Sequence, residues 1–257
     1  MMTDISKAYK NKKAFTAFLT CGDPDIGTTE KCIFEMQENG ASLIELGIPF
    51  SDPTAEGPVI MAADERALES GTTTDSVFEM LGRIKDRVYV PLVIMTYANV
   101  VFSYGIDEFA CKAHENGISG LILPDVPFEH KAEFSDICSL YGIDIISLVA
   151  PTSDDRIKMI AQNADGFIYL VSSLGVTGMR SSINTDISSI VKKIRQYTSV
   201  PCSVGFGIKD PAQAREISKV CDGVIVGSAI VDIIAKYGVD SPVYVGRYVK
   251  RMTDAMN

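Results

Sequence analysis

Eight short apolar runs, each followed by a longer amphipathic segment, constrain the fold of this chain more than any other feature. The runs are AFTAFLT from Ala14, SLIEL from Ser42, VPLVIM from Val90, GLIL from Gly120, DIISLV from Asp144, GFIYLV from Gly166, VPCSV from Val200 and GVIVG from Gly223. Almost continuous apolar runs are typical of parallel strands that are buried on both faces. Eight strand–helix units favour closure into a barrel over an open sheet. The pattern predicts an α/β fold, a (β/α)8 or TIM barrel, as a single domain over residues 1–257.

The chain is acidic, with 33 Asp and Glu residues against 24 Lys and Arg residues and a net charge of −9. Such a surface repels nucleic acid and anionic lipid, so neither is an expected partner. The six cysteines form no C-x-x-C pair, and both His114 and His130 fall in helix-like stretches, so no metal site is predicted. The polar N-terminus lacks the apolar segment of a signal peptide, and no apolar run reaches the ~18 residues of a membrane span. These features predict a cytoplasmic protein.

A carboxylate ends the second apolar run, where barrels of this type carry their chemistry. Side chains alternate along a strand, so Leu43 and Glu45 share one face. A Glu at a strand end usually reaches solvent or pairs with a basic residue, but no Lys or Arg lies nearby in the sequence. Burial raises the pKa of a Glu towards neutrality, which lets one group both donate and accept a proton. Glu45 is therefore the predicted general acid/base.

The next loop, PFSDPTAEGP, holds two more carboxylates, Asp52 and Glu56. Its prolines and glycine restrict the backbone, so both groups are expected to be held near the mouth of the barrel. An Asp before a Pro is commonly a turn residue that bonds its own backbone, which is the alternative for Asp52. For Glu56 the alternative is that Gly57-Pro58 simply opens the following helix.

Glycine-bearing turns follow the last two runs, with Gly205 and Gly207 after the seventh and Gly227 and Ser228 after the eighth. Exposed backbone N–H groups and a helix N-terminus at this place bind phosphate without formal positive charge. A small phosphorylated substrate is therefore expected. The loop after the sixth run, SSLGVTGMRSSINT, is rich in small residues and is predicted to be a mobile lid, although an ordinary surface turn has the same composition.

Together these motifs resemble the tryptophan synthase alpha subunit family over essentially the whole chain. The segment LIELGIPFSDPTAEGP resembles the family's signature around its two catalytic carboxylates, and AFLTCGDP, MTYANVVFSYGIDEF, LPDVP, YLVSSLGVTG, GFGI and GSAIV follow in the family's order. The resemblance implies a lyase of tryptophan biosynthesis that cleaves indole-3-glycerol phosphate to indole and glyceraldehyde 3-phosphate. Glu45 matches the general acid/base, and Glu56 matches the carboxylate that binds the indole N–H, a position that is usually Asp.

The resemblance also implies roles for other positions. Those expected to bind the substrate are Phe18, Ile60, Met95, Tyr97, Pro124, Tyr169, Thr177, Gly178, Phe206, Gly207, Gly227 and Ser228. Asp52 is expected to orient the lid, and Asp52, Pro53 and Asn99 lie where relatives dock a β subunit, into which indole passes within an α2β2 heterotetramer. The family's pyridoxal phosphate belongs to that β subunit, so no cofactor is expected in this chain.

Several other functions fit the sequence less well. A Schiff-base aldolase is disfavoured because no Lys lies in the eight apolar runs, and a metal-dependent aldolase because the histidines lie outside the strand ends. A phosphosugar isomerase or epimerase fits the fold but lacks the ELGIPFSDP motif. The remaining alternative is a catalytically weakened binding or regulatory subunit, because Glu56 replaces the usual Asp.

Overall fold

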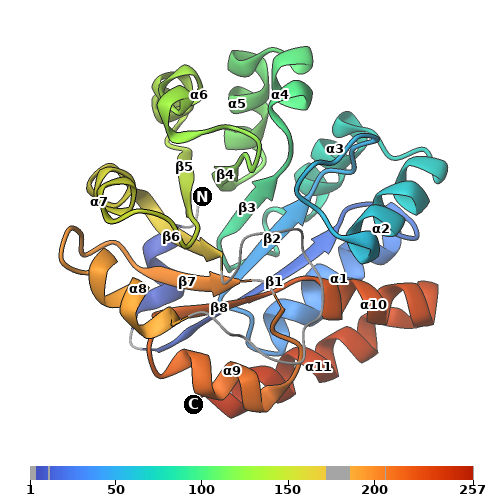
Figure 1. The fold of residues 1–257 in the computed structure, drawn as a ribbon. Coiled ribbons are helices and arrows are strands. Elements are labelled where there is room, and N and C mark those ends of the chain that lie inside the picture. The colour runs from blue at the N-terminus through green and yellow to red at the C-terminus, as the bar shows by residue number, and fades with distance from the viewer. Residues whose placement is uncertain (1–3, 11, 172–185, 206, 257) are drawn as a thin grey trace.

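Eight parallel strands form a closed barrel and follow one another around it in chain order (Figure 1). The structure is a computed structural model that describes residues 4–10, 12–171, 186–205 and 207–256. β1 pairs with both β2 and β8, which closes the sheet. The strands are β1 Ala14–Thr20, β2 Leu43–Gly47, β3 Leu92–Met95, β4 Ile118–Ile122, β5 Asp144–Val149, β6 Asp165–Val171, β7 Cys202–Gly205 and β8 Gly223–Val226.

Helices surround the barrel on the outside (Figure 1). The α-helices are α1 Ile26–Glu38, α2 Pro58–Glu69, α3 Thr74–Ile84, α4 Ala98–Tyr104, α5 Ile106–Glu115, α6 Ala132–Cys138, α7 Asp154–Gln162, α8 Ile187–Ile194, α9 Pro211–Ser218, α10 Ser228–Tyr237 and α11 Ser241–Met256. Four short 3-10 helices are η1 Ile5–Tyr9, η2 Phe128–His130, η3 Ser139–Tyr141 and η4 Gly238–Asp240. No helix in these ranges is long and apolar enough to cross a membrane.

The two faces of the sheet belong to two different apolar clusters. Ile44 and Leu46 pack with the surrounding helices in the outer cluster. Leu43, which directly precedes Ile44, belongs to a second cluster inside the barrel, with Val93 and Ile225. Because side chains alternate, the face of β2 that carries Leu43 also carries Glu45, so Glu45 is directed into the barrel.

The amino end of the barrel is covered by η1. Ile5 and Ala8 are buried in the inner cluster. The hydroxyl groups of Tyr9 and Ser203 on β7 lie 2.7 Å apart and share a hydrogen bond. The candidate site residues gather at the opposite end of the barrel, where the strands have their carboxyl ends.

All eight predicted strands are confirmed, with ends that differ by up to two residues. The helix expected from Thr28 begins at Ile26, because the Asp25 carboxylate accepts the backbone N–H of Thr28 and caps the first turn. It ends at Glu38, and Gly40 follows at φ +100°, a left-handed conformation that glycine adopts without strain.

Candidate active site

Glu45 is a carboxyl group buried inside the barrel. Its side chain is 1% exposed, and its Oε2 atom has no hydrogen-bond partner among the residues that the structure describes. Burial, and to a smaller degree the charge of Glu56, raises the pKa of Glu45 to about 8. A carboxyl group with that pKa is mostly protonated at neutral pH and can donate its proton and take one back.

Glu56 lies at the end of the loop between β2 and α2 and is 8% exposed. The Tyr97 hydroxyl donates a short hydrogen bond to its Oε2 atom. The same hydroxyl accepts the backbone N–H groups of Thr54 (3.1 Å) and Ala55 (2.9 Å). Burial raises the pKa of Glu56 to about 7, against the opposing effect of the nearby backbone N–H groups. Tyr97, expected as a pocket wall, therefore also holds the loop that presents Glu56.

Asp64 is a third buried carboxyl group, and it was not predicted from the sequence. It lies on α2, is 6% exposed, and accepts a hydrogen bond from the Thr20 hydroxyl at 3.4 Å. Burial is the main cause that raises the pKa of Asp64 to about 8, and the Glu56 charge adds to it. In the sequence Asp64 looks like an ordinary polar helix residue, and only the packing of α2 on β1 reveals its burial.

An apolar wall stands beside these carboxyl groups. Phe18 on β1 is paired in register with Glu45, and it packs in one cluster with Ile60 and the partly buried Met95. A Cβ at Gly47 would lie 2.8 Å from the Phe18 ring, so this close approach requires glycine in β2. Three of the expected substrate-binding residues are thus brought together.

Tyr169 on β6 completes the inner surface. It is 7% exposed, and burial, with a smaller contribution from the Glu45 charge, raises its pKa well above the ordinary value. A Cβ at Gly205 would lie 2.6 Å from the Tyr169 ring, so the glycine at the end of β7 makes room for it. Tyr169 therefore lies on the same inner surface as Glu45.

The expected phosphate end is formed in part by the N-terminus of α10. Gly227 is its N-cap residue and Ser228 its first residue, and both are half-buried. Gly207 has φ +82°, a conformation that favours glycine. Backbone N–H groups at such a terminus attract an anion. Thr177, Gly178 and Phe206, and the predicted lid, lie outside the described residues.

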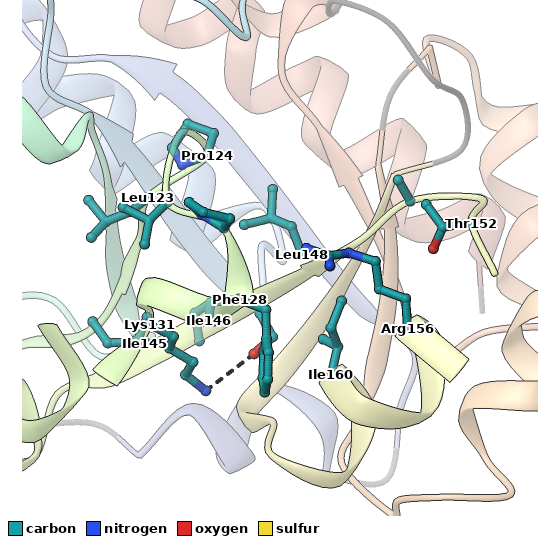
Figure 2. A pocket seen from close by; sticks show the side chains of 14 residues that line it. Leu123, Pro124, Phe128, Lys131, Ile145, Ile146, Leu148, Thr152, Arg156 and Ile160 are labelled. Atoms are coloured by element: carbon teal, nitrogen blue, oxygen red, sulfur yellow. Dashed lines mark hydrogen bonds between the residues drawn. The ribbon is translucent and has the colours of Figure 1, made fainter. Parts of the chain in front are cut away.

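The loops after β3 and β4 are joined by a capping interaction that was not expected. Both carboxylate oxygens of Asp125 accept the backbone N–H of Ala98, at 3.0 and 3.1 Å, at the start of α4. Asn99, one residue on, is exposed, as is Asp52, while Pro53 is half-buried. Pro124 lines a cavity at the carboxyl ends of β4 and β5, together with Leu148 (Figure 2).

The site fits proton-transfer chemistry on a small molecule. It combines a buried carboxyl group whose Oε2 atom has no hydrogen-bond partner among the described residues, a second carboxyl group held by a phenol, an apolar wall and a helix N-terminus. In the described ranges no group of three or more His, Cys, Asp or Glu side chains is arranged to hold a metal ion.

Comparisons with known proteins show which family this chain belongs to. The family model described as "Tryptophan synthase alpha chain" matches residues 5–255. Relatives with that same description are 47% identical in Lactiplantibacillus plantarum and 43% identical in Lacticaseibacillus casei, each over all of this chain and 97% of its own length.

Solved structures show the same architecture. The tryptophan synthase alpha subunit of Legionella pneumophila has a TM-score of 0.91 and 34% identity, covering 100% of this chain and 99% of its own. A chain of the tryptophan synthase α2β2 complex of Pyrococcus furiosus has a TM-score of 0.86 and 32% identity, covering 94% and 98%. This chain belongs to the tryptophan synthase alpha chain family.

Proposed function

We propose that this chain cleaves indole-3-glycerol phosphate to indole and glyceraldehyde 3-phosphate in tryptophan biosynthesis, with Glu45 and Glu56 as its catalytic carboxyl groups. The observation that carries the assignment is the buried Glu45, which is directed into the barrel and whose Oε2 atom has no hydrogen-bond partner among the described residues. The names of its relatives support the reaction.

Glu45 moves the proton. Its carboxyl group protonates C3 of the indole ring, which makes the ring nitrogen electron-poor. The bond between C3 and the glycerol chain then breaks, and its electron pair restores the indole ring. The glycerol hydroxyl loses its proton to Glu45 as the aldehyde forms, so the group ends the cycle as it began. A pKa of about 8 suits both directions of transfer near neutral pH.

Glu56 stabilises the positive charge that develops on the ring nitrogen. Its pKa of about 7 leaves a substantial fraction ionised at neutral pH. The Tyr97 hydroxyl fixes one carboxyl oxygen and two backbone N–H groups of the same loop, which limits how far the longer Glu side chain can move. Such positioning compensates for the extra methylene relative to Asp.

The other residues of the site would contact the rest of the substrate. Phe18, Ile60 and Met95 would contact the indole ring, Tyr169 the glycerol chain, and Gly207, Gly227 and Ser228 the phosphate. We assign Thr177, Gly178, Phe206 and Pro124 to the substrate as well, on the family resemblance alone.

We further propose that this chain binds a β subunit in an α2β2 complex, as its Pyrococcus furiosus relative does. The exposed Asp52 and Asn99, with the half-buried Pro53, would lie in that interface. A cytoplasmic location is also proposed, and it is supported by six free cysteines, five of them buried, as is usual in a reducing compartment.

The test is to mix the purified chain with indole-3-glycerol phosphate and measure indole release. Wild-type release is expected to fall about 100-fold or more in Glu56→Ala, because an electrostatic contact to the transition state is lost. Glu65→Ala, at an exposed position of α2, is the matched control and should keep wild-type release. Tight substrate binding without release would instead indicate the catalytically weakened binding subunit, an alternative that the relatives do not support.

A further inference from the structure

Tyr97 holds the loop between β2 and α2 at two places. Its ring stacks on Phe50, with the ring centroids 5.1 Å apart. Its hydroxyl accepts the backbone N–H groups of Thr54 and Ala55 and donates a hydrogen bond to the carboxyl group of Glu56. The position of Glu56 therefore depends on where the backbone of Tyr97 places this side chain.

The backbone of Tyr97 lies between two hydrogen bonds to the neighbouring β4 segment (Figure 1). On one side, the N–H of Thr96 donates to the carbonyl oxygen of Ile122 at 3.1 Å. On the other side, the N–H of Ala98 donates to both carboxylate oxygens of Asp125, at 3.0 and 3.1 Å. Tyr97 is thus supported from both sides by residues that end β4 or follow it.

Asp125 lies in a tight turn directly after β4. The N–H of Val126 donates to the carbonyl oxygen of Leu123 at 3.2 Å, which closes this turn. Leu123 is buried in the core between the sheet and the helices, and the ring of Pro124 restricts the backbone before Asp125. The short Asp125 side chain is therefore presented to Ala98 from a restricted part of the backbone.

The start of α4 takes its side-chain cap from this other loop. The N-cap residue of a helix usually bonds a free backbone N–H group with its own Ser, Thr, Asp or Asn side chain. Tyr97 occupies the N-cap position of α4, and its side chain makes no capping hydrogen bond. Because Asp125 supplies the cap instead, the Tyr97 side chain is available to hold Glu56.

We propose that Asp125 is a positioning residue for the cleavage reaction, which holds Glu56 in place through Ala98 and Tyr97. Asp125 is exposed, so its effect on the reaction passes through these two residues. Its role in turnover rests on the proposed function, whereas its support of the loop between β2 and α2 does not.

The test combines the kinetics of indole release with hydrogen exchange of the Thr54 and Ala55 amides, measured by NMR on the full chain. Asp125→Ala removes the acceptor for the Ala98 N–H. We expect kcat to fall about 10- to 100-fold with KM almost unchanged, because Glu56 is misplaced in the transition state. The Thr54 and Ala55 amides should exchange faster than in the wild type, although they are far from the substitution in the sequence.

Two further variants separate positioning from a general loss of stability. Asp125→Asn keeps an oxygen that can accept the Ala98 N–H, so it should restore most of kcat and the slow exchange of both amides. Asp25→Ala is the matched control, because Asp25 caps α1 in the same way. It should lower the free energy of unfolding by a similar amount in urea and leave kcat and the exchange of both amides unchanged.

A double-mutant cycle with Tyr97→Phe tests the route. In the Tyr97→Phe background, Asp125→Ala should cause little further fall in kcat, because the hydroxyl through which it acts is gone. Equal falls in kcat with and without that hydroxyl would mean that Asp125 acts by another route, such as the neighbouring Pro124, and would overturn the inference.

The inference is also overturned if Asp125→Ala leaves either kcat or the exchange of the Thr54 and Ala55 amides at the wild-type value. Failure of the proposed function is read separately, from the absence of indole release by the wild type. The amide exchange then still shows whether Asp125 holds the loop.

Discussion

Replacing Glu45 by Gln is expected to stabilise the protein increasingly as pH rises. The pKa of Glu45 is raised from 4.5 to about 8 in the folded chain. The folded state therefore holds a proton that the unfolded state has released, so the wild-type free energy of unfolding falls as pH rises through this window. Each pKa unit is worth about 1.4 kcal/mol. The raised pKa of Glu45 therefore lowers the free energy of unfolding by about 1 kcal/mol at pH 5, about 3 kcal/mol at pH 7 and about 5 kcal/mol at pH 9.

Gln keeps the shape of the protonated acid but does not titrate, so it removes this cost. Urea unfolding of both proteins at pH 5, 7 and 9 measures the difference, which should grow by about 4 kcal/mol over the range. Glu79→Gln, at an exposed position of α3, should show no such growth. A difference between the Glu45→Gln variant and wild type that is the same at all three pH values would refute the reasoning.

The same variant should lose indole release by about 10²- to 10⁴-fold, because it cannot transfer a proton. Stability and activity would then move in opposite directions on one substitution. A stabilised variant that kept full activity would show that Glu45 is buried for a reason other than proton transfer.

Three further predictions follow from the same site. Tyr97→Phe should lower the unfolding free energy by about 1–3 kcal/mol and slow indole release, because Glu56 loses its phenol partner; unchanged turnover would exclude the positioning role. Gly205→Ala should destabilise by about 1–3 kcal/mol in urea unfolding, because the new methyl group meets the Tyr169 ring; a neutral effect would contradict that contact. The pKa of Asp64 is also raised to about 8, so Asp64→Asn should become more stable relative to wild type as pH rises from 5 to 9, as expected for Glu45→Gln. A stability difference that does not change with pH would contradict this prediction.

The strands could be predicted because each is a continuous apolar run, and burial on both faces leaves no other pattern for a strand of this barrel. Glu45 could be placed for a related reason. It interrupts an apolar run, and alternation places it on the face that carries Leu43. The inner cluster that holds Leu43 then shows that this face is directed into the barrel. The helix starts were harder, since the start of α1 depends on one hydrogen bond from Asp25.

Contacts between distant parts of the chain could not be predicted. Tyr97 and Glu56 are 41 residues apart, and only the register of β2 with β3 brings their loops together. The burial of Asp64 depends in the same way on how α2 packs against β1, as its bond to Thr20 shows.

The cover at the amino end has a consequence for the order in which the chain assembles. Ile5 lies over Gly120 and Gly166, where an added Cβ would come within 3.0 and 3.2 Å of its Cδ1 atom, and Tyr9 bonds Ser203. These partners are made more than 100 residues after η1 on the ribosome. η1 must therefore wait for β7 before all of its native contacts exist, and such long-range contacts form slowly. Until then the inside of the growing sheet stays open to water at that end.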